Sequence, residues 1–399
     1  GAGKVINWFR LPATGGWVPT ARAGHTAVTV GTDMVMFGGI VNGHRTAEVA
    51  RFDLTMRAWH RLTCHGPHNS SNNIRGGERA LTPVTPTPRA FHVSWEFDAD
   101  LYVHGGEGSM GVQNIDNGGV GGCGANINAE LEGLLEGVGR DPFAEEDGGV
   151  PLERGRVVVG GGGLSGHRGG ARGDKGISHA SQRQERDNVA VTILEDVWKL
   201  DVRTHQWERL SSRLAPLGRK GHVAAVAPLR EQPHVFIFGG VPRGRLGLSN
   251  ALYSVDLSRL SIGEGTWKRH RPGGVMPLAR QGHSFTVVGG GKRLVLYGGV
   301  GESGELLNDV QILDIDGGQL SWAQVQTPVG DVPMARQGHS ACEVPASACY
   351  AAGISSGLGC VLIFGGEGRT DAGPEEVRRT DSHQLSLYDP QVVLTSTGV

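Results

Sequence analysis

The chain of 399 residues is poor in cysteine, in aromatic side chains and in net charge, and it contains no long apolar run. It has 38 Lys and Arg against 40 Asp and Glu, so there is no basic excess for nucleic acid or an acidic membrane surface. No apolar stretch approaches the roughly 18 residues that a membrane-spanning helix needs. No secretion signal is visible in the first residues. We therefore expect neither a nucleic-acid nor a membrane partner.

The cysteines do not form a recognisable framework. They are Cys64, Cys123, Cys342, Cys349 and Cys360. An odd number without zinc-like spacing favours free thiols in an intracellular protein, and we expect a cytoplasmic location. A local disulfide between Cys349 and Cys360 in a secreted chain is the alternative. Because no serine nucleophile elbow and no phosphate-binding loop occurs, the sequence predicts no catalytic residue and no cofactor.

Glycine is abundant, with 66 residues, and much of it accompanies a four-residue phrase that recurs five times. The phrases are Arg22-Ala23-Gly24-His25, Arg89-Ala90-Phe91-His92, Arg219-Lys220-Gly221-His222, Arg280-Gln281-Gly282-His283 and Arg336-Gln337-Gly338-His339. The Gly-Gly pairs that follow them are Gly38-Gly39, Gly105-Gly106, Gly239-Gly240, Gly298-Gly299 and Gly365-Gly366. A fixed internal repeat decides what its residues mean, so we assign these Arg, His and Gly residues structural roles.

Each unit of the repeat predicts four short β-strands. An apolar stretch follows the His, a β-rich run leads into the glycines, a third strand ends near an Asp, and a Trp opens the fourth. The Asp residues are Asp53, Asp201, Asp256, Asp314 and Asp389, and the Trp residues are Trp59, Trp207, Trp267 and Trp322. Four-stranded units that each leave an apolar face uncovered must stack on their neighbours, and a radial stack is a propeller.

Together these motifs resemble the kelch repeat, whose period is about 50 residues. The Arg-to-Arg spacings here are 67, 130, 61 and 56, and the resemblance covers residues 1–106 and 191–389. It implies an all-β, kelch-type β-propeller of the same kind as the central domain of galactose oxidase. We expect residues 1–399 to form one domain with five recognisable four-stranded blades.

One segment near the start of the sequence bears on how the ring closes. Asn7-Trp8-Phe9-Arg10-Leu11 is typical of a Trp strand, which the last unit lacks, so we expect residues 5–11 to complete the last blade.

Residues 107–190 interrupt the second unit, and their Gly-rich composition predicts a largely flexible insertion. Arg156-Val157-Val158-Val159, followed by Gly160-Gly161, offers a sixth blade as the alternative. The insertion is either a partner-binding arm or a low-complexity loop.

Three residues match a metal-binding spacing. Glu96, Asp100 and His104 have the Glu-x3-Asp-x3-His pattern with which plant specifier proteins of the kelch type bind iron. His104 also occupies the place that Phe37, Phe238, Tyr297 and Phe364 hold before the glycines, so we predict a strand position and no metal.

Two other metal sites are considered. Galactose oxidase binds copper through Tyr and His, but Tyr253, Tyr297 and Tyr388 here fall on strands. Cys64-His65-Gly66-Pro67-His68 lacks further ligands at a recognisable distance.

The repeat arginines allow two interpretations. Guanidinium groups gathered at one mouth of the ring would receive a carboxylate or phosphate. Pairing with the Asp positions from blade to blade is the interpretation that we favour.

Function in propellers usually lies in the loops at the two faces. After the glycines, we expect partner-binding side chains at Arg45, Arg243, Arg245, Glu302 and Arg369. The resemblance implies a non-catalytic scaffold that binds a protein partner. The alternatives are a metal-dependent kelch enzyme, or a recognition or regulatory domain of a larger ubiquitin ligase, phosphatase or methyltransferase.

Overall fold

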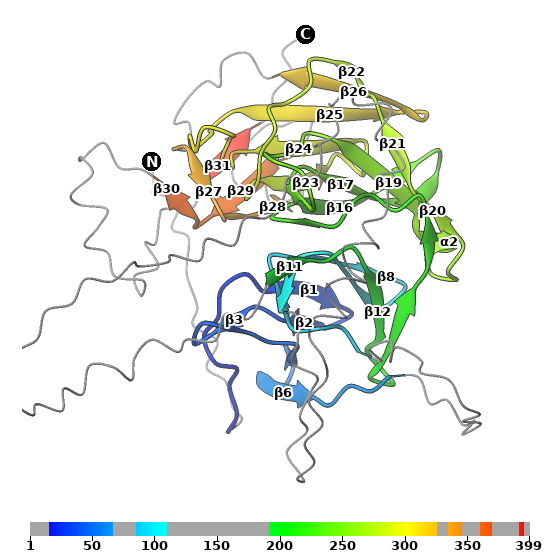
Figure 1. Cartoon of the computed structure of the whole chain (residues 1–399), viewed down its shortest axis with the longest axis vertical. Coiled ribbons are helices and arrows are strands. Elements are labelled where there is room, and N and C mark those ends of the chain that lie inside the picture. Colours follow the sequence, from blue (N-terminus) through cyan, green and yellow to red (C-terminus); the bar gives the residue numbers. More distant parts are fainter. Residues whose placement is uncertain are drawn as a thin grey trace, which may run out of the picture.

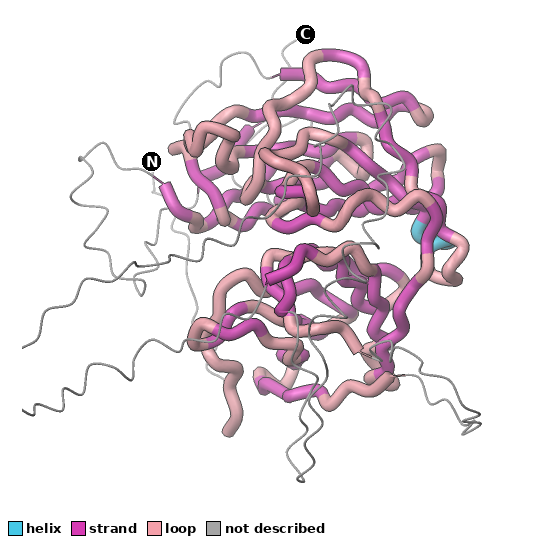
Figure 2. Tube along the Cα trace, viewed as in Figure 1, coloured by secondary structure: helices cyan, strands magenta, loops and turns pink. Residues whose placement is uncertain are grey.

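The computed structural model of the chain describes residues 16–66, 85–109, 191–324, 334–344, 360–368 and 391–394. These residues form antiparallel sheets set side by side around a common centre (Figure 1). Figure 2 shows strands throughout, and the helix α2 (Leu257–Leu260) is the only one in these ranges. The prediction of an all-β propeller is confirmed for this part of the chain. No helix in it is long and apolar enough to cross a membrane.

The first two blades each have the four strands that the repeat predicts. Blade 1 consists of β1 (Thr26–Val30), β2 (Asp33–Phe37), β5 (Val49–Asp53) and β6 (Ala58–Leu62), in that order. Blade 2 consists of β8 (Val93–Phe97), β9 (Asp100–His104), β12 (Val197–Asp201) and β13 (Gln206–Leu210). The chain therefore returns to blade 2 after residue 190 and adds its two outer strands there.

Blades 3 and 4 repeat the pattern. Blade 3 consists of β16 (Val223–Leu229), β17 (Gln232–Phe238), β19 (Leu252–Asp256) and β21 (Lys268–His270). Blade 4 consists of β23 (Ser284–Val288), β24 (Arg293–Tyr297), β25 (Val310–Asp316) and β26 (Gln319–Gln324), with β22 (Gly273–Gly274) added at its outer edge. The Trp of each unit lies in or beside the fourth strand, as predicted.

The last blade departs from the expected register. Its described strands are β28 (Ser340–Val344), β29 (Cys360–Phe364) and β31 (Gln391–Leu394). In blade 1, Asp53 ends the third strand and pairs with the first residue of β2. In the last blade, Leu394 has this place, because it pairs with Cys360, the first residue of β29. The expectation that this strand ends near Asp389 is therefore wrong by about one strand length. Residues 5–11 and 156–161, on which the closing strand and the sixth blade depend, lie outside the described residues.

The two ends of the blades carry different connections. Because the strands are antiparallel, the loop after each Gly-Gly pair and the link to the next blade lie at the same end, which we call the loop face. The tight turns, such as 98–99 and 230–231, and helix α2 lie at the other end, the hairpin face. Short strands brace the loop face: β3 (Ile40–Val41), β4 (His44–Arg45), β7 (Arg89–Ala90), β10 (Glu107–Ser109), β11 (Val191–Ile193), β15 (Arg219–Lys220), β18 (Val241–Pro242), β27 (Arg336–Gln337) and β30 (Glu367–Gly368). Two further short strands, β14 (Ser212–Arg213) and β20 (Gly265–Thr266), pair in parallel and join the outer edges of blades 2 and 3.

The core lies between neighbouring blades. Phe37 of blade 1 packs on Trp207 of blade 2, with ring centroids 5.2 Å apart, and Phe238 of blade 3 packs on Trp322 of blade 4 at 5.4 Å. Each apolar cluster joins two adjacent sheets, so no blade buries its own face alone. The first strands β1, β8, β16, β23 and β28 contact one another in this order around the centre.

Candidate functional site: the loop face

The repeat arginines are buried structural side chains. The Nη1 atom of each donates to the carbonyl of the first glycine in its own Gly-Gly pair, at 3.3 Å for Arg22 and at 3.0 Å for Arg219, Arg280 and Arg336. Arg89 makes the same bond at 3.1 Å. Burial of these guanidinium groups argues against the alternative interpretation, a ring of cations that receives an anion at one mouth.

Carboxylates neutralise three of these arginines, but not the carboxylates that we expected. The partners are Glu48 for Arg22, Asp196 for Arg89 and Asp309 for Arg280, each just ahead of the third strand of the same blade. The Asp residues at the end of that strand in blades 1, 2 and 3 instead accept hydrogen bonds from the backbone that follows. Asp53, for example, accepts hydrogen bonds from the backbone N–H groups of Thr55 and Met56, which shapes the following turn. The ion pairs therefore stabilise blades 1, 2 and 4 from within.

The Gly-Gly pairs join each blade to the next one. The N–H of Gly240 donates to the carbonyl oxygen of Arg280 at 2.8 Å, and the first glycine of the pair, Gly239, has a φ of +74°. A Cβ atom at Gly239 would stand 2.7 Å from that carbonyl oxygen and 2.7 Å from Cε1 of His283. Glycine is therefore needed here both for the backbone conformation and for the close approach of the neighbouring blade.

The repeat histidines reach back to the preceding blade. His92 shares a hydrogen bond with Thr26 at 2.8 Å, and His339 shares one with Ser284 at 2.8 Å. The rings of His92, His222, His283 and His339 also meet the aromatic side chain that precedes the glycines one blade earlier, such as Tyr297 against His339. Burial, followed by the charge of Arg89, lowers the pKa of His92 to about 3, so this ring is neutral at pH 7.

Four of these rings surround the centre of the propeller. They line a cavity of about 270 Å³ at the start of the first strands, together with residues such as Thr26 and Ser284. The lining histidines are His92, His222, His283 and His339. Within the described ranges, no three His, Cys, Asp or Glu side chains are arranged to hold a metal ion.

The three residues with the metal-binding spacing, Glu96, Asp100 and His104, lie at different places on the β8–β9 hairpin. Glu96 pairs with Leu101 across the β8–β9 hairpin and accepts a hydrogen bond from the N–H of Ala99 at 2.9 Å. His104 lies three residues further along β9 and its Nδ1 atom is 3.0 Å from Nε2 of His222. As the sequence indicates, residues 96–100 form the hairpin, and the three side chains do not converge.

The two thiols whose side chains the structure describes belong to no group of metal ligands among the described residues. Cys64 is half-buried and free, and burial raises the pKa of its thiol to about 12. Cys342 is free and exposed. His68, Cys123 and Cys349, on which the soft-metal site and the disulfide depend, lie outside the described residues.

The charged residues that we predicted on the loop face lie in different surroundings. Arg45 is mostly buried and forms an ion pair with Glu107 of blade 2, which also binds Lys220 of blade 3 at 2.7 Å. Arg243 and Arg245 lie in the loop of blade 3, and Gly247 of that loop faces the carboxylate of Glu302 in blade 4. The structure thus brings Arg243, Arg245 and Glu302 onto neighbouring loops, while Arg45 serves an inter-blade network. Arg369 lies outside the described residues.

The sequence analysis missed the apolar side chains of this face. Eleven large apolar side chains are exposed among the described residues, and eight of them belong to the loop face. These eight are Val18, Phe91, Val191, Leu214, Leu246, Val275, Leu278 and Met334. Leu54, Met56 and Ile262 lie on the hairpin face. A signal was present, because several of these residues stand in Pro- and Gly-containing links where no strand needs an apolar side chain.

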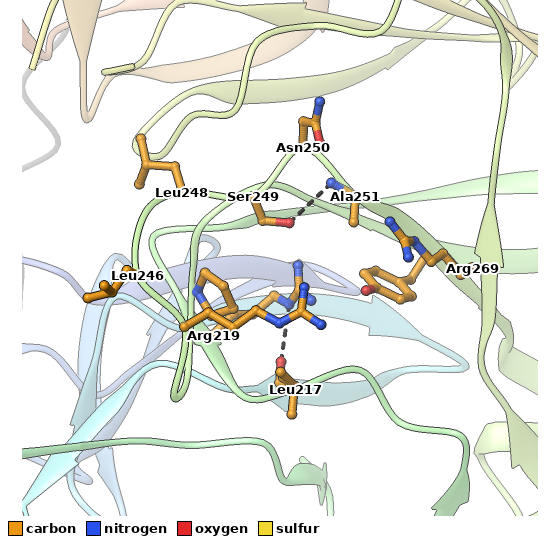
Figure 3. A pocket seen from close by; sticks show the side chains of 11 residues that line it. Leu217, Arg219, Leu246, Leu248, Ser249, Asn250, Ala251 and Arg269 are labelled. Carbon is orange, nitrogen blue, oxygen red and sulfur yellow. Dashed lines mark hydrogen bonds between the residues drawn. The ribbon is translucent and has the colours of Figure 1, made fainter. Parts of the chain in front are cut away.

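A pocket opens beside the loop of blade 3. It has a volume of about 220 Å³ and is lined by Arg219, Arg245 and Arg269, together with Tyr253 and the segment 248–251. Figure 3 shows Arg219 below that segment and Arg269 to its side. The guanidinium of Arg219 lies 4.8 Å from the centre of the Tyr253 ring, and its Nε donates to the carbonyl of Leu217. We call this cavity the arginine pocket.

Comparison with known proteins agrees with the architecture. Residues 183–364 match the family model described as the KLHDC2/KLHL20/DRC7 Kelch-repeats domain, and residues 21–65 match the Kelch motif. The chain is a kelch-repeat β-propeller, as the motifs predicted.

Several curated relatives share this region. Acyl-CoA-binding domain-containing protein 5 of Arabidopsis thaliana is 27% identical over 84% of this chain and 44% of its own length. Adagio-like protein 1 of Oryza sativa subsp. japonica is 30% identical over 53% of this chain and 30% of its own length. Adagio protein 3 of Arabidopsis thaliana is 30% identical over 51% of this chain and 29% of its own length. The chain thus spans less than half the length of these relatives.

Among solved structures, the one titled "Structure of YjhT" aligns with 94% of this chain and 79% of its own, at 15% identity and a TM-score of 0.49.

Proposed function

We propose that this chain is a non-catalytic interaction module that binds a protein partner through the loop face of its propeller. The observation that supports this most is the gathering there of eight of the eleven large apolar side chains that are exposed among the described residues. Single exposed apolar residues are ordinary, but several on one face are typical of an interaction surface. Kelch repeats most often serve as interaction domains, which supports the same function.

The charged residues of this face would orient the partner. Arg243, Arg245 and Glu302 on neighbouring loops give a polar rim beside the apolar residues, which is the usual composition of a protein interface. Arg369 remains a further candidate for the rim. Arg45 contributes by holding Glu107 and hence the loops of three blades.

The setting that we propose is a larger assembly in the cytoplasm. The free thiols of Cys64 and Cys342 support a reducing compartment. In the relatives, the matching region is one part of a longer chain. A recognition domain of a ubiquitin ligase, phosphatase or methyltransferase is the narrower form of this proposal.

The test compares matched surface variants. The intact protein, carrying an affinity tag, is captured from its own cells, and the bound proteins are quantified by mass spectrometry. The double variant Val275→Asp/Leu278→Asp changes two exposed side chains of the loop face, and Ile262→Asp changes an equally exposed one on the hairpin face. We expect the specific partner to fall at least about tenfold in the double variant and to stay in Ile262→Asp.

A charge-reversed form adds a second comparison. Arg243→Glu/Arg245→Glu should weaken capture, most of all at low salt, because rim charges act mainly through steering. Equal capture by all variants, or loss in Ile262→Asp alone, would refute the loop face as the binding surface. Circular dichroism of each variant checks that the fold is intact.

A further inference from the structure

The third residue of the repeat phrase forms a chain of hydrogen bonds around the centre of the loop face. In chain order this residue is Gly24, Phe91, Gly221, Gly282 and Gly338. From blade 2 onward its N–H donates to the carbonyl oxygen of the same residue one blade earlier, at 2.8 to 3.0 Å. The position therefore lies near the axis of the propeller, on the side from which the first strands start.

Phe91 is the one residue at this position that is not glycine. All five residues have a positive φ, which is +65° or +66° for the four glycines and +56° for Phe91. A bulky L-residue is disfavoured in this left-handed conformation, because its Cβ comes too close to the following carbonyl oxygen. The fold by itself favours glycine here, as in the other four phrases, so the side chain of Phe91 is kept at a cost in backbone strain.

The packing of the protein does not explain why this ring is kept. Phe91 is 43% exposed, and it belongs to neither of the buried apolar clusters on the two sides of blade 2. Its Cδ1 and Cε1 atoms would lie 3.2 and 3.1 Å from a Cβ at Gly24, so blade 1 covers only one part of the ring. Backbone strain that packing does not require is typical of a functional position.

A second exposed apolar residue of the loop face is strained in the same way. Leu214, in the link between blades 2 and 3, has a φ of +51° and is 50% exposed. In the part of the chain that the structure describes, Phe91 and Leu214 are the only large apolar residues with a positive φ. Others, such as Asp98 and Ala99, form a tight turn of the hairpin face. Strained apolar side chains that are exposed on one face favour a contact with a binding partner there.

The charges next to Phe91 are paired within the protein. Ala90, the residue before it, pairs with Glu107 across β7 and β10. The carboxylate of Glu107 forms ion pairs with Arg45 and with Lys220. A partner that reaches the centre of the loop face therefore meets an apolar ring beside charges that are already neutralised, and apolar contact is the recognition that this place favours.

We propose that Phe91 is the central anchor of the loop face, against which a protein partner packs an apolar side chain. The proposal rests on the proposed function of this face and names the residue and the partner chemistry that it uses. The partner's side chain would cover the exposed part of the ring and remove it from water. Aromatic residues near the centre of an interface commonly contribute most to its affinity.

The test captures the tagged, intact protein from its own cells and quantifies the same partner that the unchanged protein retains. Phe91→Gly introduces the residue that the other four phrases have. We expect the captured partner to fall at least about tenfold. The thermal unfolding midpoint should stay within about 3 °C of that of the unchanged protein, because the relief of backbone strain balances the lost contacts of the ring.

Three further variants make the test specific. Ala99→Gly changes another left-handed residue of blade 2, with a φ of +62°, on the hairpin face, so it should leave capture unchanged. Phe91→Asn introduces a polar side chain that tolerates this conformation, and it should lose the partner as Phe91→Gly does. Phe91→Leu keeps an apolar contact and should lose less than about threefold. The loss in Phe91→Gly should be equal at low and high salt, because no ion pair carries it.

Two results would overturn the anchor. One is full capture by both Phe91→Gly and Phe91→Asn. The other is a midpoint lowered by more than about 8 °C in both variants, since the ring would then be needed for the fold. If Val275→Asp/Leu278→Asp loses the partner while both Phe91 variants keep it, the anchor alone is refuted. If no variant of the loop face loses the partner, the proposed function fails as well.

Discussion

The imidazole rings of His104 and His222 meet with 3.0 Å between Nδ1 of the first and Nε2 of the second, and both rings are buried. The two ring planes are perpendicular. The rings of Phe238 and His283, the equivalent pair one blade later, meet at a similar angle of 87°. His104 therefore stands in an aromatic position of the repeat, and its nitrogen replaces the hydroxyl that Thr26 offers to His92. Val93, at the place of Thr26 in blade 2, has no such group.

This relationship predicts that His104→Phe is tolerated. His283 already packs on Phe238 without a hydrogen-bond partner for either ring nitrogen, so the fold accepts this pair. The variant also removes Nε2 of His104, a buried atom without a partner. We expect the free energy of unfolding, from urea titration, to change by less than about 1 kcal/mol. A loss above about 3 kcal/mol would show that the histidine pair is essential.

The neutral histidines predict a loss of stability in mild acid. Burial lowers the pKa of His339 to about 4 and that of His283 well below 6.5. A histidine whose pKa is lowered by folding contributes stability that is complete above about pH 6.5. This stability is lost as the pH falls below that value toward the folded pKa, because the unfolded chain binds the proton first.

The carboxylates extend this loss to lower pH. The pKa of Asp309 is lowered because its hydrogen bonds and charge contact with Arg280 outweigh burial, so its contribution disappears only as the pH falls below about 3.8. Urea midpoints should therefore stay nearly constant from pH 7.5 to about pH 6.5 and then fall toward pH 4.5, mainly through the histidines. A midpoint that stays constant over this interval would contradict the neutral buried rings.

Replacement by alanine should lower the free energy of unfolding strongly at Gly239 and only moderately at Gly244. Gly239→Ala forces a Cβ to 2.7 Å from the Arg280 carbonyl oxygen, and we expect a loss of more than about 3 kcal/mol. Gly244 has a similar φ of +70° but no atom within 4 Å of its Cβ position. Gly244→Ala should thus cost only the backbone strain, about 1–2 kcal/mol. Equal losses in chemical denaturation would show that the contact between blades is unimportant.

The buried ion pair of blade 4 predicts that its carboxylate is needed. Asp309→Asn leaves the fully buried side chain of Arg280 without its counter-charge, and we expect a loss of about 2–4 kcal/mol in the free energy of unfolding. The exposed pair of Arg259 and Glu264 is the control, because Arg259→Gln should change stability by less than about 0.5 kcal/mol. Similar values for the two variants would remove the distinction between buried and exposed pairs.

Much of the fold was predictable because its determinants are local. The Gly-Gly pairs and the Trp strands identified four blades with their four strands, and His104 was correctly placed on a strand. The third strand of the last blade was misplaced, since Asp389 resembles the strand-ending aspartates but precedes the strand that forms. The acid partners of the arginines were also misassigned, because Glu48, Asp196 and Asp309 differ in type and precede rather than end their strands.

Local sequence was therefore enough to establish the repeating strands, the turns and the need for glycine, since backbone conformation and strand pattern act over a few residues. Tertiary structure alone decided which side chains share a site. The arginine pocket exists because Ala251, Arg219 and Arg269, from three separate segments of blade 3, meet around one cavity. The apolar loop face likewise becomes visible only when antiparallel strands bring its links to the same end of the blades.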